Sequence, residues 1–106
     1  MSVAVVSDNF ATEVLEASEP VLADFWATWC APCRALGPVI ENLSKTYAGK
    51  VKVVKVDVDQ APDLAVQYGV RSIPTVMLFK GGQPVGRWVG VQPSATYSKA
   101  LDEHLD

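Results

Sequence analysis

This 106-residue chain has few cysteines and no excess of positive charge, and each of these two features excludes a class of protein. Two cysteines are too few for a secreted domain that is held together by a disulfide scaffold. Nine Lys and Arg against twelve Asp and Glu give a net charge of -3, so no basic field attracts nucleic acid or an anionic membrane. No apolar run reaches membrane-spanning length, and the N-terminus lacks the basic start and cleavage site of a signal peptide. We therefore expect a cytoplasmic protein that binds neither nucleic acid nor a membrane.

Hydrophobic residues make up 49% of the chain, enough for one domain over residues 1–106 with a sizeable core. Their spacing predicts five strands, at 3–6, 21–27, 51–58, 75–80 and 85–89. The run at 21–27 is almost entirely apolar, which is typical of a strand covered on both faces of a sheet. A hairpin between the last two strands is predicted by Gly81-Gly82-Gln83-Pro84.

Four helices are predicted between and after these strands. The first is capped by Ser7 or Asp8 and runs to about residue 17. The second covers 32–47, contains Pro38 and is closed by Gly49. The others cover 59–68 and the segment from about residue 93, where His104 suits the end of the helix. This alternation predicts an α/β fold with a mixed sheet, parallel first and then antiparallel, and helices on both faces.

The two cysteines, Cys30 and Cys33, lie where the strand at 21–27 gives way to the helix at 32–47. Pro32 fits a first helical turn, and the N–H groups and dipole of a helix N-terminus favour a thiolate. Three interpretations are open. A zinc site needs about four ligands, so this pair would have to share the metal with a second chain. A structural disulfide around two intervening residues would stabilise the fold little. A dithiol that cycles by thiol–disulfide exchange fits the βαβ context best.

Motifs over essentially the whole chain resemble those of the thioredoxin family. They are Asp24-Phe25-Trp26-Ala27, Trp29-Cys30-Ala31-Pro32-Cys33, Pro38, Lys55-Val56-Asp57-Val58-Asp59, Tyr68-Gly69-Val70, Ile73-Pro74-Thr75, Phe79-Lys80-Gly81-Gly82 and Val89-Gly90. The resemblance implies the thioredoxin fold, with a mixed sheet of about five strands flanked by about four helices. Two residues depart from the family pattern: Ala31 stands where glycine is usual, and Arg34 where lysine is usual. Ala31 is expected to shift the redox potential, and Arg34 to keep a positive charge near the thiolate.

The resemblance also implies roles for three residues at the predicted site. Cys30 is expected to be an exposed nucleophile and Cys33 a more buried resolving thiol, and the two form the redox disulfide. Asp24 is a carboxylate among apolar residues, so burial should raise its pKa and suit it to accept the proton of Cys33. The alternative for Asp24 is a hydrogen-bonded carboxylate with no catalytic role.

Lys55 is the expected secondary partner of Asp24. It shares one face of its strand with Val51 and Val53, and the resemblance places that strand beside the one carrying Asp24. A nearby ammonium would moderate the charge of the acid. The alternative is a lysine whose stem lies on the core while its ammonium stays in water.

A cis Ile73–Pro74 bond opposite the cysteines is another implication of the resemblance. Ile73 would offer its backbone to an extended substrate, in a short β-like pairing. The apolar contact surface for substrate is expected to comprise Trp29, Ala31, Pro32, Ile73, Pro74, Val89, Gly90 and Val91. Trp26 is expected in the core, and for Trp88 the sequence leaves open whether it packs on the last helix or is exposed.

These implications together predict a monomeric protein-disulfide reductase. Its partners would be disulfide-containing proteins and a thioredoxin reductase, linked to NADPH or to ferredoxin, that recycles it. Because the dithiol is itself the redox group, we expect no bound cofactor and no metal. Two alternatives are an oxidant or isomerase of the same fold in an exporting compartment, and a non-enzymatic partner module whose thiols matter little.

Overall fold

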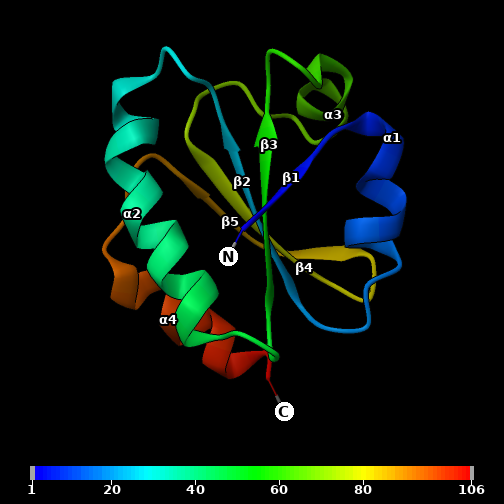
Figure 1. Ribbon diagram of the computed structural model, residues 1–106, viewed down its shortest axis with the longest axis vertical. Coiled ribbons are helices and arrows are strands. Elements are labelled where there is room, and N and C mark those ends of the chain that lie inside the picture. Colours follow the sequence, from blue (N-terminus) through cyan, green and yellow to red (C-terminus); the bar gives the residue numbers. More distant parts are fainter. Residues whose placement is uncertain (1, 106) are drawn as a thin grey trace.

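Five strands form one mixed sheet in the computed structural model, which describes residues 2–105 (Figure 1). They are β1 (Val3–Val5), β2 (Val21–Trp26), β3 (Lys52–Asp57), β4 (Thr75–Lys80) and β5 (Gln83–Val89). Their order across the sheet is β1-β3-β2-β4-β5. β1 and β2 pair parallel with β3, whereas β4 pairs antiparallel with both β2 and β5. The predicted mixed sheet is confirmed, while residues 1 and 106 of the predicted domain lie outside the described part of the chain.

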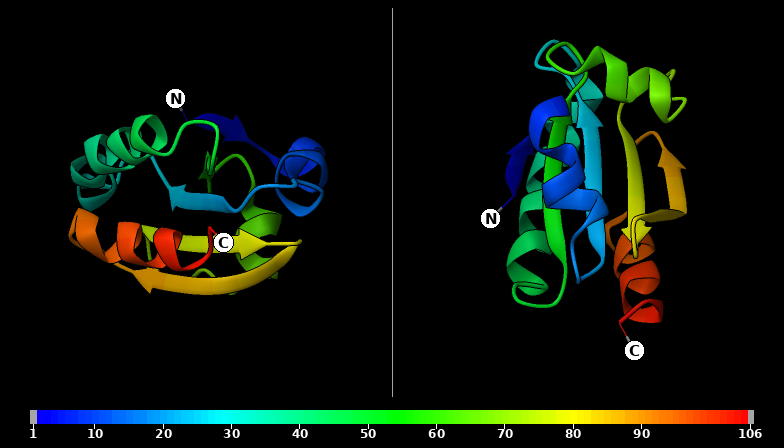
Figure 2. Two further views of the ribbon diagram at one scale, coloured as in Figure 1. Left: turned by 90° about the horizontal axis from the view of Figure 1, so that it is seen from below. Right: turned by 90° about the vertical axis from the view of Figure 1, so that its right-hand side faces the viewer.

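Helices cover both faces of the sheet, as predicted (Figures 1 and 2). α2 (Ala31–Thr46) and α4 (Ser94–Glu103) bury their apolar sides on one face. α1 (Ser7–Phe10) and α3 (Pro62–Gln67) pack on the other. Alternate residues of β2 feed the two cores, since Leu22 belongs to the first and Val21, Ala23 and Phe25 belong to the second. Burial on both faces explains why this strand is apolar except at Asp24.

The first helix differs from its prediction in both its start and its form. Its N-cap is Val6, not Ser7 or Asp8, and the Val6 N–H donates to Oδ1 of Asn9 at 2.8 Å. The α-helical turns end at Phe10 and a π-helical segment, Ala11–Leu15, follows. The cap prediction was wrong because the Asn9 side chain, three residues into the helix, accepts the Val6 N–H. This bond makes Val6 the N-cap residue, and not the first polar residue.

Three other boundaries also moved. α2 ends at Thr46, and Gly49 lies in the turn beyond it, with a φ of +82°. α3 begins at Pro62 and not at 59, because the N–H groups of residues 60 and 61 donate to the Asp57 carbonyl in a separate turn. The hairpin turn consists of Gly81 and Gly82 alone, since β5 already begins at the next residue.

The last helix settles the position of Trp88, which the sequence left open. The Trp88 ring packs edge-on against that of Tyr97 in α4, with 5.6 Å between the centroids.

Among the described residues, none of the helices combines the length and the apolar character needed to cross a membrane.

The two glycines of the hairpin give a matched pair for testing local packing. Both have positive φ, +60° at Gly81 and +78° at Gly82, but only at Gly82 would an added Cβ meet backbone, the Leu15 oxygen at 2.9 Å. We expect Gly81→Ala to lower the free energy of unfolding by about 1 kcal/mol and Gly82→Ala by about 2–3 kcal/mol, because only the second adds a clash to the left-handed strain. Urea unfolding of the two oxidised variants measures the difference, and equal losses would show that the Leu15 contact is unimportant.

Candidate functional site

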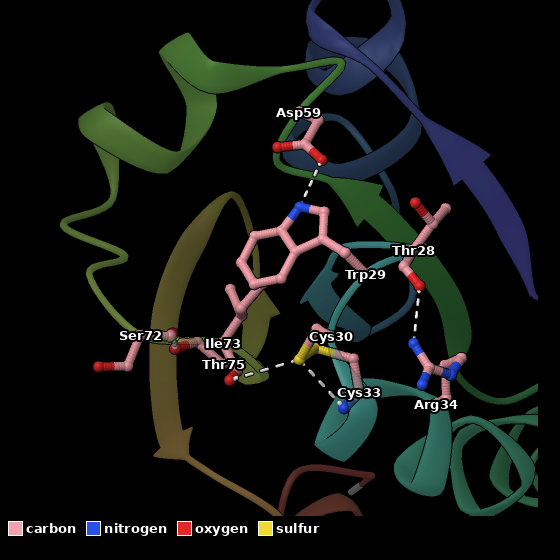
Figure 3. Close-up of a disulfide and its surroundings, with 9 residues drawn as sticks. All are labelled: Thr28, Trp29, Cys30, Cys33, Arg34, Asp59, Ser72, Ile73 and Thr75. Atoms are coloured by element: carbon pink, nitrogen blue, oxygen red, sulfur yellow. Dashed lines mark hydrogen bonds between the residues drawn. A yellow bond between two sulfur atoms is a disulfide. The ribbon is translucent and has the colours of Figure 1, made fainter.

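The two cysteines lie at the N-terminus of α2 and are joined as a disulfide (Figure 3). Cys30 is the N-cap residue, and its Sγ accepts a hydrogen bond from the backbone N–H of Cys33 at 3.2 Å. Pro32 lies in the first turn of the helix, as predicted. A sulfur that already receives a helix N-terminal N–H is well placed to carry negative charge when the disulfide is reduced.

The expected contrast in exposure between the two cysteines is not found. Cys30 is 3% exposed and Cys33 is 1% exposed, so the prediction of an exposed Cys30 was wrong. The physical reason is tertiary: both sulfurs pack in a small apolar cluster with Ala27, against which Val58 and Ile73 are placed.

Two neighbours of the disulfide are held by hydrogen bonds that lead away from it (Figure 3). The Trp29 side chain is 66% exposed, and its Nε1 donates to Oδ2 of Asp59 at 2.8 Å. The Arg34 guanidinium donates to the Thr28 carbonyl at 2.9 Å. No local pattern singles out Asp59 individually, because its contact with Trp29 spans thirty positions of the chain.

The loop before β4 faces the disulfide and contains the predicted cis Ile73–Pro74 bond, which is confirmed. The Cys30 Sγ lies 3.7 Å from the carbonyl oxygen of Ile73. The loop is fixed at both ends, because the Thr75 hydroxyl donates to the Ser72 carbonyl at 2.6 Å and the Gly90 N–H donates to the Pro74 carbonyl at 2.8 Å. A rigid stretch of backbone is thus held beside the reactive sulfur.

All but one of the residues predicted to contact substrate are at least partly exposed. They are Trp29, Ala31, Pro32, Ile73, Val89, Gly90 and Val91. Pro74 is buried, so its ring is not part of an exposed surface. The contact of these residues with a substrate remains a prediction.

Asp24 lies fully buried in the middle of β2, with Lys55 of β3 on one side and Val76 of β4 on the other. Neither carboxylate oxygen has a hydrogen-bond partner among the described residues. Burial raises the pKa of Asp24 to about 6, and the charge of Lys55 opposes this rise. Asp24 is two positions after Leu22 in β2, so both side chains lie on the face of the sheet that α2 covers.

Lys55 is half-buried, and its position was only partly predictable. The prediction that Lys55 lies beside Asp24 is confirmed, because the two residues are paired in the register of β2 and β3. Its Nζ lies 4.1 Å from the centroid of the Trp26 ring, a cation–π contact that the sequence analysis missed. Trp26, expected only as a core residue, is half-buried and holds the lysine beside the acid.

Comparison with known proteins agrees with this geometry. The family model described as Thioredoxin matches residues 1–103. Thioredoxin 1 of Nostoc sp. is 52% identical over 101 residues, which are 95% of this chain and 94% of the relative. Thioredoxin 1 of Synechococcus elongatus is 51% identical over 99% of this chain and 98% of its own length, and the chloroplastic M-type thioredoxin of Chlamydomonas reinhardtii is 46% identical over 97% and 74%. With a redox disulfide at a helix N-terminus facing a cis-proline loop, the chain belongs to the thioredoxin family.

Proposed function

We propose that the chain reduces protein disulfides with Cys30 as nucleophile and Cys33 as resolving thiol. Thiol–disulfide exchange is the activity of the family to which it belongs. The assignment of the two roles rests on one observation: the Cys30 Sγ receives the Cys33 N–H at the start of α2 and lies beside the Ile73 carbonyl. That sulfur is both the better stabilised as a thiolate and the nearer to the fixed backbone on which a substrate would pair.

The cycle begins with the reduced dithiol. The Cys30 thiolate attacks one sulfur of the substrate disulfide, the substrate S–S bond breaks, and the other substrate sulfur leaves and takes up a proton. Cys33 then loses its proton and attacks the Cys30 Sγ. This step breaks the mixed disulfide, releases the second substrate thiol and forms the Cys30–Cys33 disulfide seen in the structure. Two electrons have passed to the substrate.

Asp24 is proposed as the group that takes the proton from Cys33, directly or through a water. Its side chain enters the face of the sheet that α2 covers, and its pKa of about 6 lets it act as a base near neutral pH. Lys55, held by Trp26, moderates the negative charge that Asp24 carries before it accepts the proton.

A substrate protein would bind as an extended segment along the Ile73 backbone, with its apolar side chains on the surface around Trp29, Pro32 and Val89. Electrons return to the disulfide from a thioredoxin reductase, whose NADPH and flavin, or ferredoxin, belong to that partner. We also propose that the chain acts as a monomer in the cytoplasm, a reducing compartment in which close cysteine pairs are typically catalytic and not structural.

The experiment that tests this function couples NADPH oxidation to reduction of a protein disulfide, with a supplied thioredoxin reductase. We expect NADPH consumption to rise in proportion to the amount of this chain, and a parallel assay with a ferredoxin-linked reductase tells which enzyme serves it. Consumption no greater than with the reductase alone would contradict the proposal. Equilibration with a glutathione buffer then separates a reductant from an oxidant or isomerase, since a strongly oxidising potential would favour the latter.

A further inference from the structure

A pocket of about 290 Å³ opens next to the disulfide, on the side of α3. Its apolar walls come from the exposed indole, from the end of β3, from α3 and from the loop before the cis-proline: Trp29, Val58, Pro62, Ala65, Val70 and Ile73. Two of these residues also border the reactive sulfur, since Ile73 contacts Cys30 and Trp29 precedes it in the chain. The pocket is therefore continuous with the surface on which a substrate disulfide must bind.

The helix α3 extends this apolar surface outward. Val66 is 81% exposed and lies one turn after Pro62, on the same side of the helix. An apolar side chain this exposed is common when it stands alone. Here it adjoins a hollow with apolar walls, which suits a bulky apolar side chain from another protein.

Arg71 is the one charged residue that lines the pocket, and it is exposed. Among residues 2–105 its guanidinium makes no ion pair and no side-chain hydrogen bond within the usual distance limits. The three acids next in sequence to the pocket walls are engaged elsewhere: Asp57 accepts the backbone N–H of Asp59 at 2.9 Å, Asp59 accepts the Trp29 indole N–H, and Asp63 accepts the Ser7 hydroxyl at 2.6 Å. An arginine placed beside an apolar hollow without an internal partner is complementary to a carboxylate from outside.

We propose that this pocket selects substrate segments in which an acidic residue adjoins a bulky apolar one, close to the reactive cysteine. The apolar side chain fills the hollow between Trp29 and α3, and the neighbouring carboxylate pairs with Arg71. Because Ile73 lies both in the pocket wall and against Cys30, and an extended chain advances about 3.3 Å per residue, the selected pair is within a few residues of the substrate cysteine. The proposal rests on the proposed reductase function and adds a preference among substrates.

The test compares two disulfide-bonded peptides that differ at one position, one with Leu-Glu and one with Leu-Lys beside the reactive cysteine. The second-order rate of peptide reduction by the reduced protein is measured for each. The ratio of the Glu rate to the Lys rate is expected to be lower in Arg71→Glu than in the wild type, by about fivefold, because an exposed ion pair contributes up to about 1 kcal/mol. A matched control, Lys99→Glu, makes the same change in net charge on α4, across the sheet, and should keep the wild-type ratio.

A second variant tests the apolar part of the site. Ala65→Phe fills the hollow from α3, so we expect it to reduce the preference for Leu-Glu over Gly-Glu peptides while the preference for Glu over Lys remains. Circular dichroism of each variant checks that the fold is retained. If Ala65→Phe does not fold, the comparison of Arg71→Glu with the wild type still tests the proposal.

The outcomes separate this inference from the function beneath it. If the wild type reduces both peptides and Arg71→Glu leaves the ratio unchanged, or changes it no more than Lys99→Glu does, the selective pocket is wrong and the reductase function stands. If the wild type reduces neither peptide nor any small uncharged disulfide such as hydroxyethyl disulfide, the reductase function itself fails and the inference fails with it.

Discussion

A Cys33→Ser variant is expected to accumulate a covalent mixed disulfide with its substrates, whereas Cys30→Ser should form none and lose all turnover. The structure gives the two sulfurs different positions although both are buried. Cys30 receives the helix N-terminal N–H and contacts Ile73, while Cys33 lies inside the first turn of α2. Without Cys33 the attack still occurs, but nothing resolves the intermediate. Removing an enzyme's nucleophile can cost on the order of 10⁶-fold in rate, so turnover by Cys30→Ser should fall below detection.

Mass spectrometry of each reduced variant, after mixing with a disulfide-bonded protein, measures the adduct. The double variant Cys30→Ser/Cys33→Ser is the control for non-covalent carry-over. An adduct on Cys30→Ser that equals the one on Cys33→Ser would reverse the two roles. Full reducing activity in the double variant would instead support the non-enzymatic partner module.

The parts of the site that the sequence predicts are those with local chemical signals. Cys30 and Cys33 are separated by two residues, and their position between a strand and a helix follows from apolar spacing. Asp24 stands out as an acid in an apolar strand. The neighbourhood of Asp24 and Lys55 follows from strand pairing, which the family resemblance supplies. For the cysteines and for Asp24 itself, a short stretch of chain carries enough information to place the side chain.

What the sequence missed depends on contacts between distant segments. The burial of Cys30 is produced by the Ile73 loop, more than forty residues away in the chain. The Trp29–Asp59 hydrogen bond and the position of Lys55 over Trp26 join segments about thirty residues apart. The start of the first helix was mispredicted for a subtler reason. The Asn9 side chain, at the third position of the helix, accepts the Val6 N–H, so Val6 and not one of the polar residues is the N-cap. Neither periodicity nor composition predicts these contacts or this N-cap, since several arrangements of the side chains are compatible with the same hydrophobic pattern.

Asp24→Asn is expected to stabilise the oxidised protein at alkaline pH, by an amount that depends on pH in a defined direction. Burial raises the pKa of Asp24 from 3.8 to about 6 in the folded protein. Between these two values the unfolded chain is ionised while the folded chain keeps its proton, so the folded state binds more protons and stability falls as pH rises. Above about pH 6 the penalty is complete. From pH 4 to pH 8 the stability of Asp24→Asn relative to the wild type should therefore rise by about 2–3 kcal/mol.

Urea unfolding of both oxidised proteins at several pH values measures this difference, with Glu16→Gln as a control that removes one exposed carboxylate and should follow the wild type. The buried amide adds a cost of its own, but that cost does not change with pH, so the slope and not the offset carries the test. A flat difference across this range would mean that the pKa of Asp24 is not raised.

Asp24→Asn also distinguishes a catalytic base from a buried acid without a catalytic role. For this test, the resolution of the mixed disulfide by Cys33 is measured as a separate step. A chromophoric thiol is first coupled to Cys30, and its release by Cys33 is followed in a single turnover. With Asp24 as the base, the wild-type rate rises as pH increases through about 6, because only the ionised carboxylate accepts the proton of Cys33. Asp24→Asn should release the thiol about 100-fold more slowly at pH 7, the lower end for loss of a general base, and without that rise. Equal rates in the two proteins would assign the proton of Cys33 to another acceptor and leave Asp24 as a buried charge whose only measurable effect is on stability.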